Sequence, residues 1–328
     1  MTDKTSDIFF NSLKRYYYRL FFVIIMGFMF VIFSAETHFL GDGYAMLSNL
    51  SSESGTYYLW TEALVILIVK FIQSPLGTPG YDTAQTAFRI VAVLAGVITI
   101  WFYFLIADII SNNSRMRLLA FASLFGSGTL LLFFGYVESY PLLWIGFSGL
   151  IYFAISFLKT GRNLILVLLF FTFGALIHLQ MLVLSPAIIY LLFSRGRGRL
   201  LYDKYKKYFW GLSTLLTAIG VYFFFRKYYS NLYFENIFLP LFKGKPATPS
   251  YYIFSFTHFI DIANQLLLLS PLFPLFVVAA IMQKKPILNS SINIFLGITG
   301  ICSLGFIFVV DPQLSMPRDW DLFSLTGF

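Results

Sequence analysis

Asp42 and Glu138 are the two acidic residues whose surroundings best suit catalytic work. Asp42 stands between Gly41 and Gly43, and glycines on both sides let the backbone turn sharply and bring the carboxylate close to a ligand. Glu138 lies in a very short turn that closes at Pro141, where the next helix is expected to start. A glutamate in such a turn beside apolar helices is partly desolvated and needs a partner. The alternatives are a solvated loop aspartate and a glutamate that caps the next helix.

Other polar side chains interrupt apolar runs and could bind a substrate. His178 breaks a long apolar stretch, although a lone histidine at a helix junction is more often a structural, hydrogen-bonded residue. Arg318, Asp319 and Asp321, beside a tryptophan, form the densest polar cluster on the side of the membrane that is expected to face outward. The planar fork of Arg318 suits a phosphate group. The alternative for this cluster is an arginine–aspartate ion pair with an interfacial tryptophan anchor.

Lys243 and Lys245 are further candidates for phosphate, with simple solvation in an exposed loop as the alternative. The sequence requires no cofactor. Its His and acid spacings match no metal motif such as His-Glu-x-x-His, although acids from separate loops could gather around a divalent cation. It has no glycine-rich nucleotide loop, no Walker lysine and no Gly-x-Ser-x-Gly elbow.

The composition indicates the elements that must position these side chains. Of the 328 residues, 58% are hydrophobic and 12% are charged, with a mean hydropathy of +0.77. A soluble domain carries about 25% charged residues, so we predict an all-α polytopic membrane protein. The net charge of +8 is then better explained by the sidedness of membrane loops than by nucleic acid, which we do not expect as a partner.

A bilayer core needs roughly 20 apolar residues per helix. By this measure the chain has about nine transmembrane helices in a single domain, 1–328, and its abrupt end suggests a missing C-terminal part. Seven of the predicted spans are Tyr18–Ala35, Ala87–Ile110, Leu118–Tyr136, Tyr140–Leu158, Tyr208–Phe225, Ala263–Met282 and Ile292–Val310. The stretch Asn163–Ser194 is predicted to form two short helices that meet near His178.

The apolar run Tyr57–Ile72 is predicted not to cross. Glu62, Lys70 and Gln73 fall on one side of such a helix, which favours an amphipathic interfacial helix within a long first outer loop, 36–86. A second large outer loop spans 226–262. With a cytoplasmic N-terminus, this layout places most of the 23 Lys and Arg on the cytoplasmic side. Those at the first two cytoplasmic loops are Lys4, Lys14, Arg15, Arg19, Arg115 and Arg117.

The same layout places most of the acids and all histidines on the outer side, which is therefore the expected working face. The pattern resembles the C-type membrane glycosyltransferases (GT-C), especially the polyprenyl-phosphate-sugar-dependent branch of protein mannosyltransferases and aminoarabinose transferases. The resemblance rests on the cytoplasmic N-terminus, the long first outer loop with an early acid, the helix from Phe88-Arg89 onward, the short second outer loop with an acid, and the short central helices.

This resemblance implies that Asp42 is the catalytic base and that Glu138 is the second-loop acid; the family often has two adjacent acids where this chain has Asp42-Gly43. By analogy of role, Arg318 would meet the lipid phosphate. The implied partners are a polyprenyl-phosphate-linked sugar, a lipid, glycan or protein acceptor, and membrane lipid. The implied reaction is inverting transfer at the outer face of a bacterial inner (plasma) membrane. A transporter or flippase for a lipid or glycan, and a non-catalytic GT-C-like scaffold, are the alternatives.

Overall fold

The computed structural model describes residues 3–37, 42–52, 62–194, 204, 207, 237–245, 248–282, 290–312 and 315–327. Within these ranges the regular structure is helical, with two isolated antiparallel β-bridges, so the all-α prediction is confirmed for this part of the chain. The chain forms two compact units. Unit 1 comprises Met1–Phe153 and Ile165–Met181, and unit 2 comprises Ala154–Leu164 and Leu182–Phe328.

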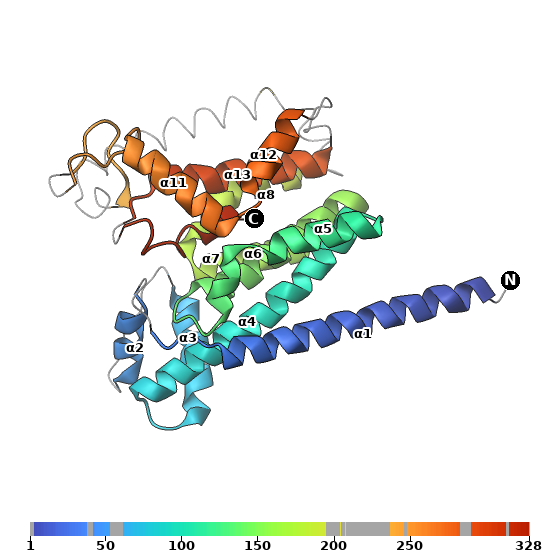
Figure 1. The fold of residues 1–328 in the computed structure, drawn as a ribbon, viewed down its shortest axis with the longest axis horizontal. Coiled ribbons are helices and arrows are strands. Elements are labelled where there is room, and N and C mark those ends of the chain that lie inside the picture. The colour runs from blue at the N-terminus through green and yellow to red at the C-terminus, as the bar shows by residue number, and fades with distance from the viewer. Residues whose placement is uncertain are drawn as a thin grey trace. The chain divides into compact units, whose positions relative to one another are not determined.

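The helices follow one another along the chain as labelled in Figure 1. The α-helices are α1 (Asp3–Ile32), α2 (Gly43–Ser51), α3 (Ala63–Gln73), α4 (Tyr81–Ile110), α5 (Ser114–Phe125), α6 (Tyr140–Thr160), α7 (Leu164–Ile177), α8 (Ser185–Ser194), α11 (Phe256–Leu269), α12 (Phe273–Met282) and α13 (Ser291–Val309). Short 3₁₀ helices are η1 (Ser74–Leu76), η2 (Gly128–Phe133), η3 (Leu179–Leu184) and η4 (Ser324–Gly327).

Four helices among the described residues are long and apolar enough to cross a bilayer: Arg15–Ile32, Tyr81–Ile110, Tyr140–Thr160 and Ser291–Val309. Together with several shorter apolar helices, they fit the membrane-embedded protein that the composition predicts. Counting the bent pair α11–α12 as one span gives five. The predicted span Tyr208–Phe225 lies outside the described residues, so a total of about nine spans stays a prediction.

Two predicted spans differ from the structure. Leu118–Tyr136 is not one helix, because α5 ends at Phe125 with Gly126 as its C-cap. The chain restarts as η2, where the Ser127 side chain accepts the Thr129 N–H. The predicted Ala263–Met282 span is two helices that meet at 101°. Pro271 lies in this break and has no backbone N–H to continue a helix. The prediction of two short helices around His178 is confirmed by α7 and by η3 with α8.

The helix predicted over Tyr57–Ile72 is observed as α3, and residues 57–61 lie outside the described residues. At 11 residues, or about 16 Å, α3 is too short to cross a bilayer. Glu62, at its N-cap, and Gln73 are 7% and 5% exposed. The apolar Val65, Ile66 and Val69 are buried as well, whereas Leu67 and Phe71 are 50% and 78% exposed. The buried side of α3 thus carries both polar and apolar residues, and its exposed side is apolar at Leu67 and Phe71.

The central helix of unit 1 is α4, which packs against α1, α2, α3, α5 and η2 (Figure 1). Gly96 allows the closest approach, since a Cβ there would lie 2.6 Å from atoms of both Phe30 and Phe133. Phe30 and Phe133 are themselves fully buried. Only 11% of the α1 span is buried, compared with 56% of the α4 window. The wide exposed apolar surface of α1 suits contact with lipid.

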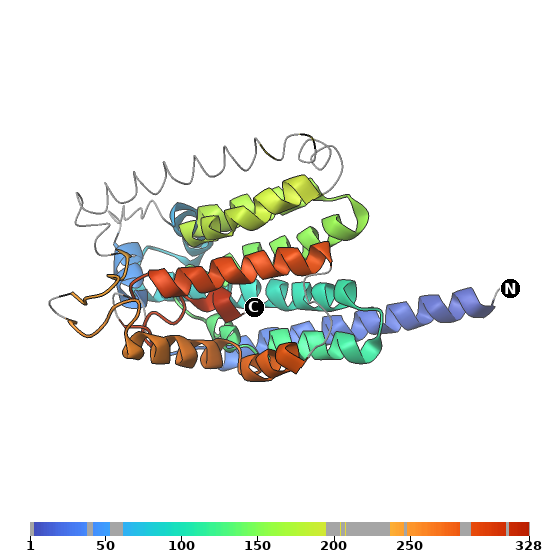
Figure 2. The same ribbon diagram turned by 90° about the horizontal axis from the view of Figure 1, so that it is seen from above.

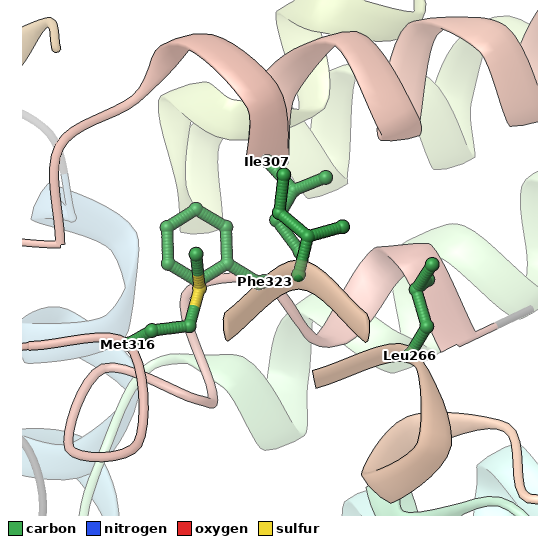
Figure 3. Packing of buried hydrophobic residues seen from close by; sticks show 5 residues of the cluster. Leu266, Ile307, Met316 and Phe323 are labelled. Carbon is green, nitrogen blue, oxygen red and sulfur yellow. The ribbon is translucent and has the colours of Figure 1, made fainter. Parts of the chain in front are cut away.

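Unit 2 has its own apolar core, shown in Figure 3. The buried members of this core are Ile262, Leu266, Ile307, Met316 and Phe323. They come from α11, α13 and the segment after α13, so the C-terminal turns are packed against the two helices. Elsewhere in unit 2, α8 and α13 lie side by side (Figure 2).

Candidate functional site

Backbone contacts in unit 1 join the end of α1 to α4 and to the turn before α6. The Ala35 N–H donates to the carbonyl of Phe134 at 2.7 Å. Arg89 of α4 donates from Nη2 to the Ala35 carbonyl at 3.0 Å, and the same nitrogen lies 3.6 Å from Glu36 Oε2. These contacts fix the point where the first loop leaves α1 against the turn that carries Glu138.

Gly135 makes this tight turn possible. Its φ of +74° lies in the left-handed region, which is costly for residues with a Cβ. A Cβ at this position would also lie 2.4 Å from Ser34 Oγ and 3.0 Å from Arg89 Cγ. The turn therefore needs glycine for both its conformation and its close contact with α1 and α4.

The two predicted acids meet through the backbone of one of them. Glu138 is 4% exposed, and its Oε1 accepts the N–H of Asp42 at 2.6 Å. Asp42 occupies the N-cap position of α2, but its side chain does not cap the helix, and the residue is exposed. Glu138 thus holds the peptide of Asp42 and leaves the Asp42 carboxylate at the surface.

His178 lies two positions before Gln180 in the break between α7 and η3. Its Nδ1 accepts the Gln180 N–H at 3.1 Å, which assigns the proton of the neutral ring to Nε2. Nε2 lies 3.5 Å from Oε1 of the buried Glu62. The ring also packs against Tyr140, with centroids 5.3 Å apart. His178 therefore presents an N–H toward a carboxylate.

Burial lowers the pKa of His178 to about 4. A neighbouring carboxylate favours the imidazolium, but 3.5 Å is longer than the roughly 2.7–2.9 Å of a charge-assisted N–H···O bond. We therefore take burial as the dominant influence, and the imidazole as neutral at pH 7. In this state His178 can donate a hydrogen bond but cannot supply a cation for a phosphate group.

Gln73 holds the helices that carry the acids. Its side-chain amide donates to the Leu50 carbonyl in α2 at 3.2 Å and to Thr83 Oγ1 in α4 at 3.1 Å. Because α3 follows directly from Glu62 and α2 follows directly from Asp42, these bonds tie both acids to α4. We call Asp42, Glu62, Glu138, Tyr140 and His178 the acid cluster.

The two predicted lysines lie in unit 2. Lys245 Nζ pairs with Asp311 Oδ2 at 2.5 Å, and both side chains are largely buried, at 25% and 14% exposure. An antiparallel bridge between Phe238 and Val310 brings their two segments together. Lys243 is exposed. The charge of Lys245 therefore stabilises the fold locally, whereas Lys243 points into the surroundings.

The predicted polar cluster near the C-terminal end divides into exposed and buried members. Arg318 is exposed, Asp319 is half-buried and Asp321 is 2% exposed. Asp321 accepts the Leu322 N–H through Oδ1 at 2.9 Å, which gives it a structural role at the start of the last turn. No carboxylate of the described residues forms an ion pair with Arg318, so the predicted arginine–aspartate pair is not observed there.

Asp42, Glu138 and His178 all belong to unit 1, where Asp42 contacts Glu138 and His178 contacts Glu62 and Tyr140. The other predicted site residues, Lys243, Lys245, Arg318, Asp319 and Asp321, all belong to unit 2. Sequence reasoning missed Glu62 as a member of the cluster, because it treated this residue only as part of the polar side of an interfacial helix. It also missed Gly135, whose position directly before the Glu138 turn was the available signal.

Within the described ranges, no three His, Cys, Asp or Glu side chains form a group that could hold a metal ion. No protein-family model, curated protein or solved structure matches this chain.

Proposed function

We propose that the protein is a membrane glycosyltransferase that moves a sugar from a polyprenyl-phosphate carrier to an acceptor hydroxyl at the outer face. The observation that carries this proposal is the contact between the two loop acids. Glu138 of the second loop is buried and binds the backbone of Asp42 in the first loop at 2.6 Å. This contact leaves an exposed carboxylate on a fixed backbone, as a general base needs.

In the proposed reaction Asp42 takes the proton of the acceptor hydroxyl. The acceptor oxygen forms its bond to the anomeric carbon as the bond from that carbon to the carrier phosphate breaks. The electron pair leaves with the polyprenyl phosphate, and attack from the opposite side inverts the anomeric centre. A base within hydrogen-bond reach of the acceptor contributes roughly 10²–10⁴ in rate.

Glu138 and His178 act on this reaction as positioning residues. Glu138 holds the Asp42 peptide, and Tyr140, two residues later, packs on the ring of His178. His178 in turn faces Glu62 at the start of α3. Together these contacts link the first loop to the start of α6 and to the break after α7, so we expect the orientation of the base to depend on all of them.

The departing phosphate needs a cation or hydrogen-bond donors aimed at its growing charge. Among the predicted cations, Lys245 is engaged by Asp311, whereas Arg318 and Lys243 are exposed. Arg318, with its bidentate fork, is proposed as the first candidate for the phosphate and Lys243 as the second, on the resemblance and on side-chain chemistry alone, since both belong to unit 2.

The test is transfer of radiolabel from polyprenyl-phosphate mannose and polyprenyl-phosphate aminoarabinose to membrane acceptors by the purified protein in liposomes. Asp42→Asn keeps the size of the side chain and removes its basicity, so we expect at least a ~100-fold loss of transfer. The matched control is Asp82→Asn, an exposed acid in the first turn of α4, which we expect to leave transfer unchanged.

Normal transfer by Asp42→Asn would refute the assignment of the base. Uptake of the labelled lipid into the liposomes without a new glycosidic bond would favour a transporter instead. Absence of both transfer and uptake in the wild type, with every donor tried, would favour a non-catalytic scaffold.

A further inference from the structure

Two adjoining cavities lie between α1, α4 and α5 in unit 1, away from the acid cluster. Their volumes are about 480 Å³ and 240 Å³. Both are lined by Arg15, Arg19, Phe104, Leu118 and Phe121. The larger also reaches Phe22, and the smaller also reaches Arg117 and Asp108. We call these two cavities together the arginine pocket.

The arginines on the cationic side of the arginine pocket are held in place by contacts within the protein. Arg19 binds Asp108 with both guanidinium nitrogens, at 2.5 and 2.8 Å, and lies over the ring of Phe104 at 5.3 Å. Arg117 lies 3.7 Å from the same carboxylate and donates to Ser114 Oγ at 3.1 Å. One carboxylate cannot neutralise Arg15, Arg19 and Arg117, so the pocket keeps a net positive charge.

The other side of the pocket is a wall of aromatic rings. Phe104 and Phe121 are stacked, with centroids 4.1 Å apart and planes 8° from parallel. Phe22 meets both of them edge-on at 5.7 Å. Leu118, at the rim, is 67% exposed. A small hydrated anion gains nothing from contact with an apolar wall. An amphiphile with an anionic head and an acyl chain can contact both the arginines and the aromatic rings.

This pocket is distinct from the proposed transfer site. Asp108 lies near the C-terminal end of α4, and Arg89 lies in its N-terminal half, so about 28 Å of helix separates them. The positive-inside pattern predicts that the arginines are on the cytoplasmic side, where anionic lipids attract basic clusters. Arginines that only set topology need no fixed geometry, whereas Arg19 is bound to Asp108 through both nitrogens.

We propose that the arginine pocket binds an anionic membrane phospholipid. Arg15 and Arg117 bind its phosphate, Arg19 is the fixed floor of the site, and an acyl chain packs on Phe22, Leu118 and Phe121. The occupant is a lipid and not a free phosphate, because most of the side chains that line the larger of the two cavities are aromatic or aliphatic. Lipid bound here would brace α1, whose remaining surface is mostly exposed, against α4 and α5.

The experiment measures binding of phosphatidylglycerol to the full-length protein by native mass spectrometry, with phosphatidylcholine and inorganic phosphate as comparison ligands. We expect phosphatidylglycerol to bind at least ~10-fold more tightly than phosphatidylcholine in the wild type. The double variant Arg15→Gln/Arg117→Gln should lose about that factor, because it removes the charge-assisted contacts and leaves the Arg19–Asp108 pair intact. The matched control Arg115→Gln removes an exposed arginine of α5 that does not line the pocket, and binding should stay within about twofold.

A second variant separates lipid from small anion. Leu118→Asn replaces an exposed apolar residue of the wall with a polar one and should weaken the binding of phosphatidylglycerol several-fold. Equal binding of the two phospholipids, an equal loss in Arg115→Gln, or displacement of the lipid by equimolar inorganic phosphate would each overturn the proposal. So would unchanged phosphatidylglycerol binding in both Arg15→Gln/Arg117→Gln and Leu118→Asn.

Discussion

Buried carboxylates are held in different ways in the two units. In unit 1, Glu138 accepts a backbone N–H from Asp42, and Glu62 faces the imidazole of His178, which is neutral at pH 7. In unit 2, Asp311 is held by the ammonium of Lys245 at 2.5 Å. The first kind of contact orients a carboxylate through neutral donors, and the second cancels its charge with a cation.

The kind of partner that holds a carboxylate distinguishes a structural residue from a candidate catalytic one. A carboxylate paired with a cation stabilises the segments that carry the pair, and the pair has little charge left for a ligand. A carboxylate oriented by a backbone N–H or a neutral imidazole is held by a contact that brings no cation with it. The acid cluster is therefore the better candidate for proton transfer, and Lys245 with Asp311 is the better candidate for a purely structural pair.

The largest effect on stability is expected at Gly135, whose backbone conformation shapes the turn that carries Glu138. Gly135→Ala should lower the free energy of unfolding by about 3 kcal/mol or more, since a Cβ would meet Ser34 Oγ at 2.4 Å in a left-handed conformation. Chemical unfolding in detergent micelles measures this. Gly300→Ala is the control, because nothing lies within 4 Å of its Cβ position, and it should be neutral or stabilising. Similar values for both variants would show that the turn does not support the cluster.

Replacing Glu138 distinguishes orientation from charge. Glu138→Ala should lower transfer about 100-fold, which corresponds to about 2.7 kcal/mol. Glu138→Gln should retain most of the activity, because its side-chain oxygen can still accept the Asp42 N–H. Initial rates of label transfer, compared at equal protein folding, measure both. If Gln is as damaging as Ala, then the Glu138 carboxylate acts in the chemistry itself.

The neutral state of His178 gives unit 1 a pH dependence. Its pKa is about 4 in the folded protein and about 6.5 when unfolded, so between these values the unfolded chain binds the additional proton. Stability therefore falls as pH is lowered from 7 toward 4, by about 2 kcal/mol at pH 5, and this contribution is constant above pH 7.

Unfolding free energies of wild type and His178→Gln at pH 7.5 and pH 5 measure that dependence. The difference between the two proteins should shrink at pH 5, because only the wild type must keep a histidine neutral. Glu62→Gln in the same background checks the facing carboxylate. An identical pH slope with and without His178 would show that its burial does not set its charge.

The smallest effect is expected in unit 2. Lys245→Met should lower the free energy of unfolding by about 1 kcal/mol, because it leaves Asp311 without its cation. Lys243→Met, at an exposed position two residues earlier, should change it by less than about 0.5 kcal/mol. A selective loss of sugar transfer in Lys245→Met, with stability unchanged, would contradict the structural role and restore Lys245 as a substrate ligand.

The sequence predicted the elements whose ends carry strong local signals. The α6 helix begins at Tyr140, as the Pro141 signal indicated, and the break near His178 follows from polar residues and Pro186 within an apolar run. The break after α5 was missed, because Gly126 and Ser127 are small residues that a transmembrane helix tolerates. The position of the break depends on a local cap, in which the Ser127 side chain accepts an N–H, and a hydropathy pattern does not detect such a cap.

Sequence reasoning selected Asp42, Glu138 and His178 but could not predict how they meet. The bond between Asp42 and Glu138 joins residues 96 positions apart, and it uses a backbone N–H that every non-proline residue has. Periodicity grouped Glu62 with Gln73 on one side of the helix, but it does not indicate whether that side meets the protein, water or lipid. Contacts of this kind depend on tertiary packing and not on local pattern.

The orientation of α3 predicts that the candidate site depends on lipid. Its exposed Leu67 and Phe71 would be unfavourable in water, whereas its buried Glu62 and Gln73 hold the first loop in place. Without the bilayer, exposure of Leu67 and Phe71 to water would favour a different orientation of this short helix. Such a change would release the Asp42 loop without any change in the amino-acid sequence. Preparations in harsh detergent should lose the site while the larger helices persist, and restoring lipid should bring it back.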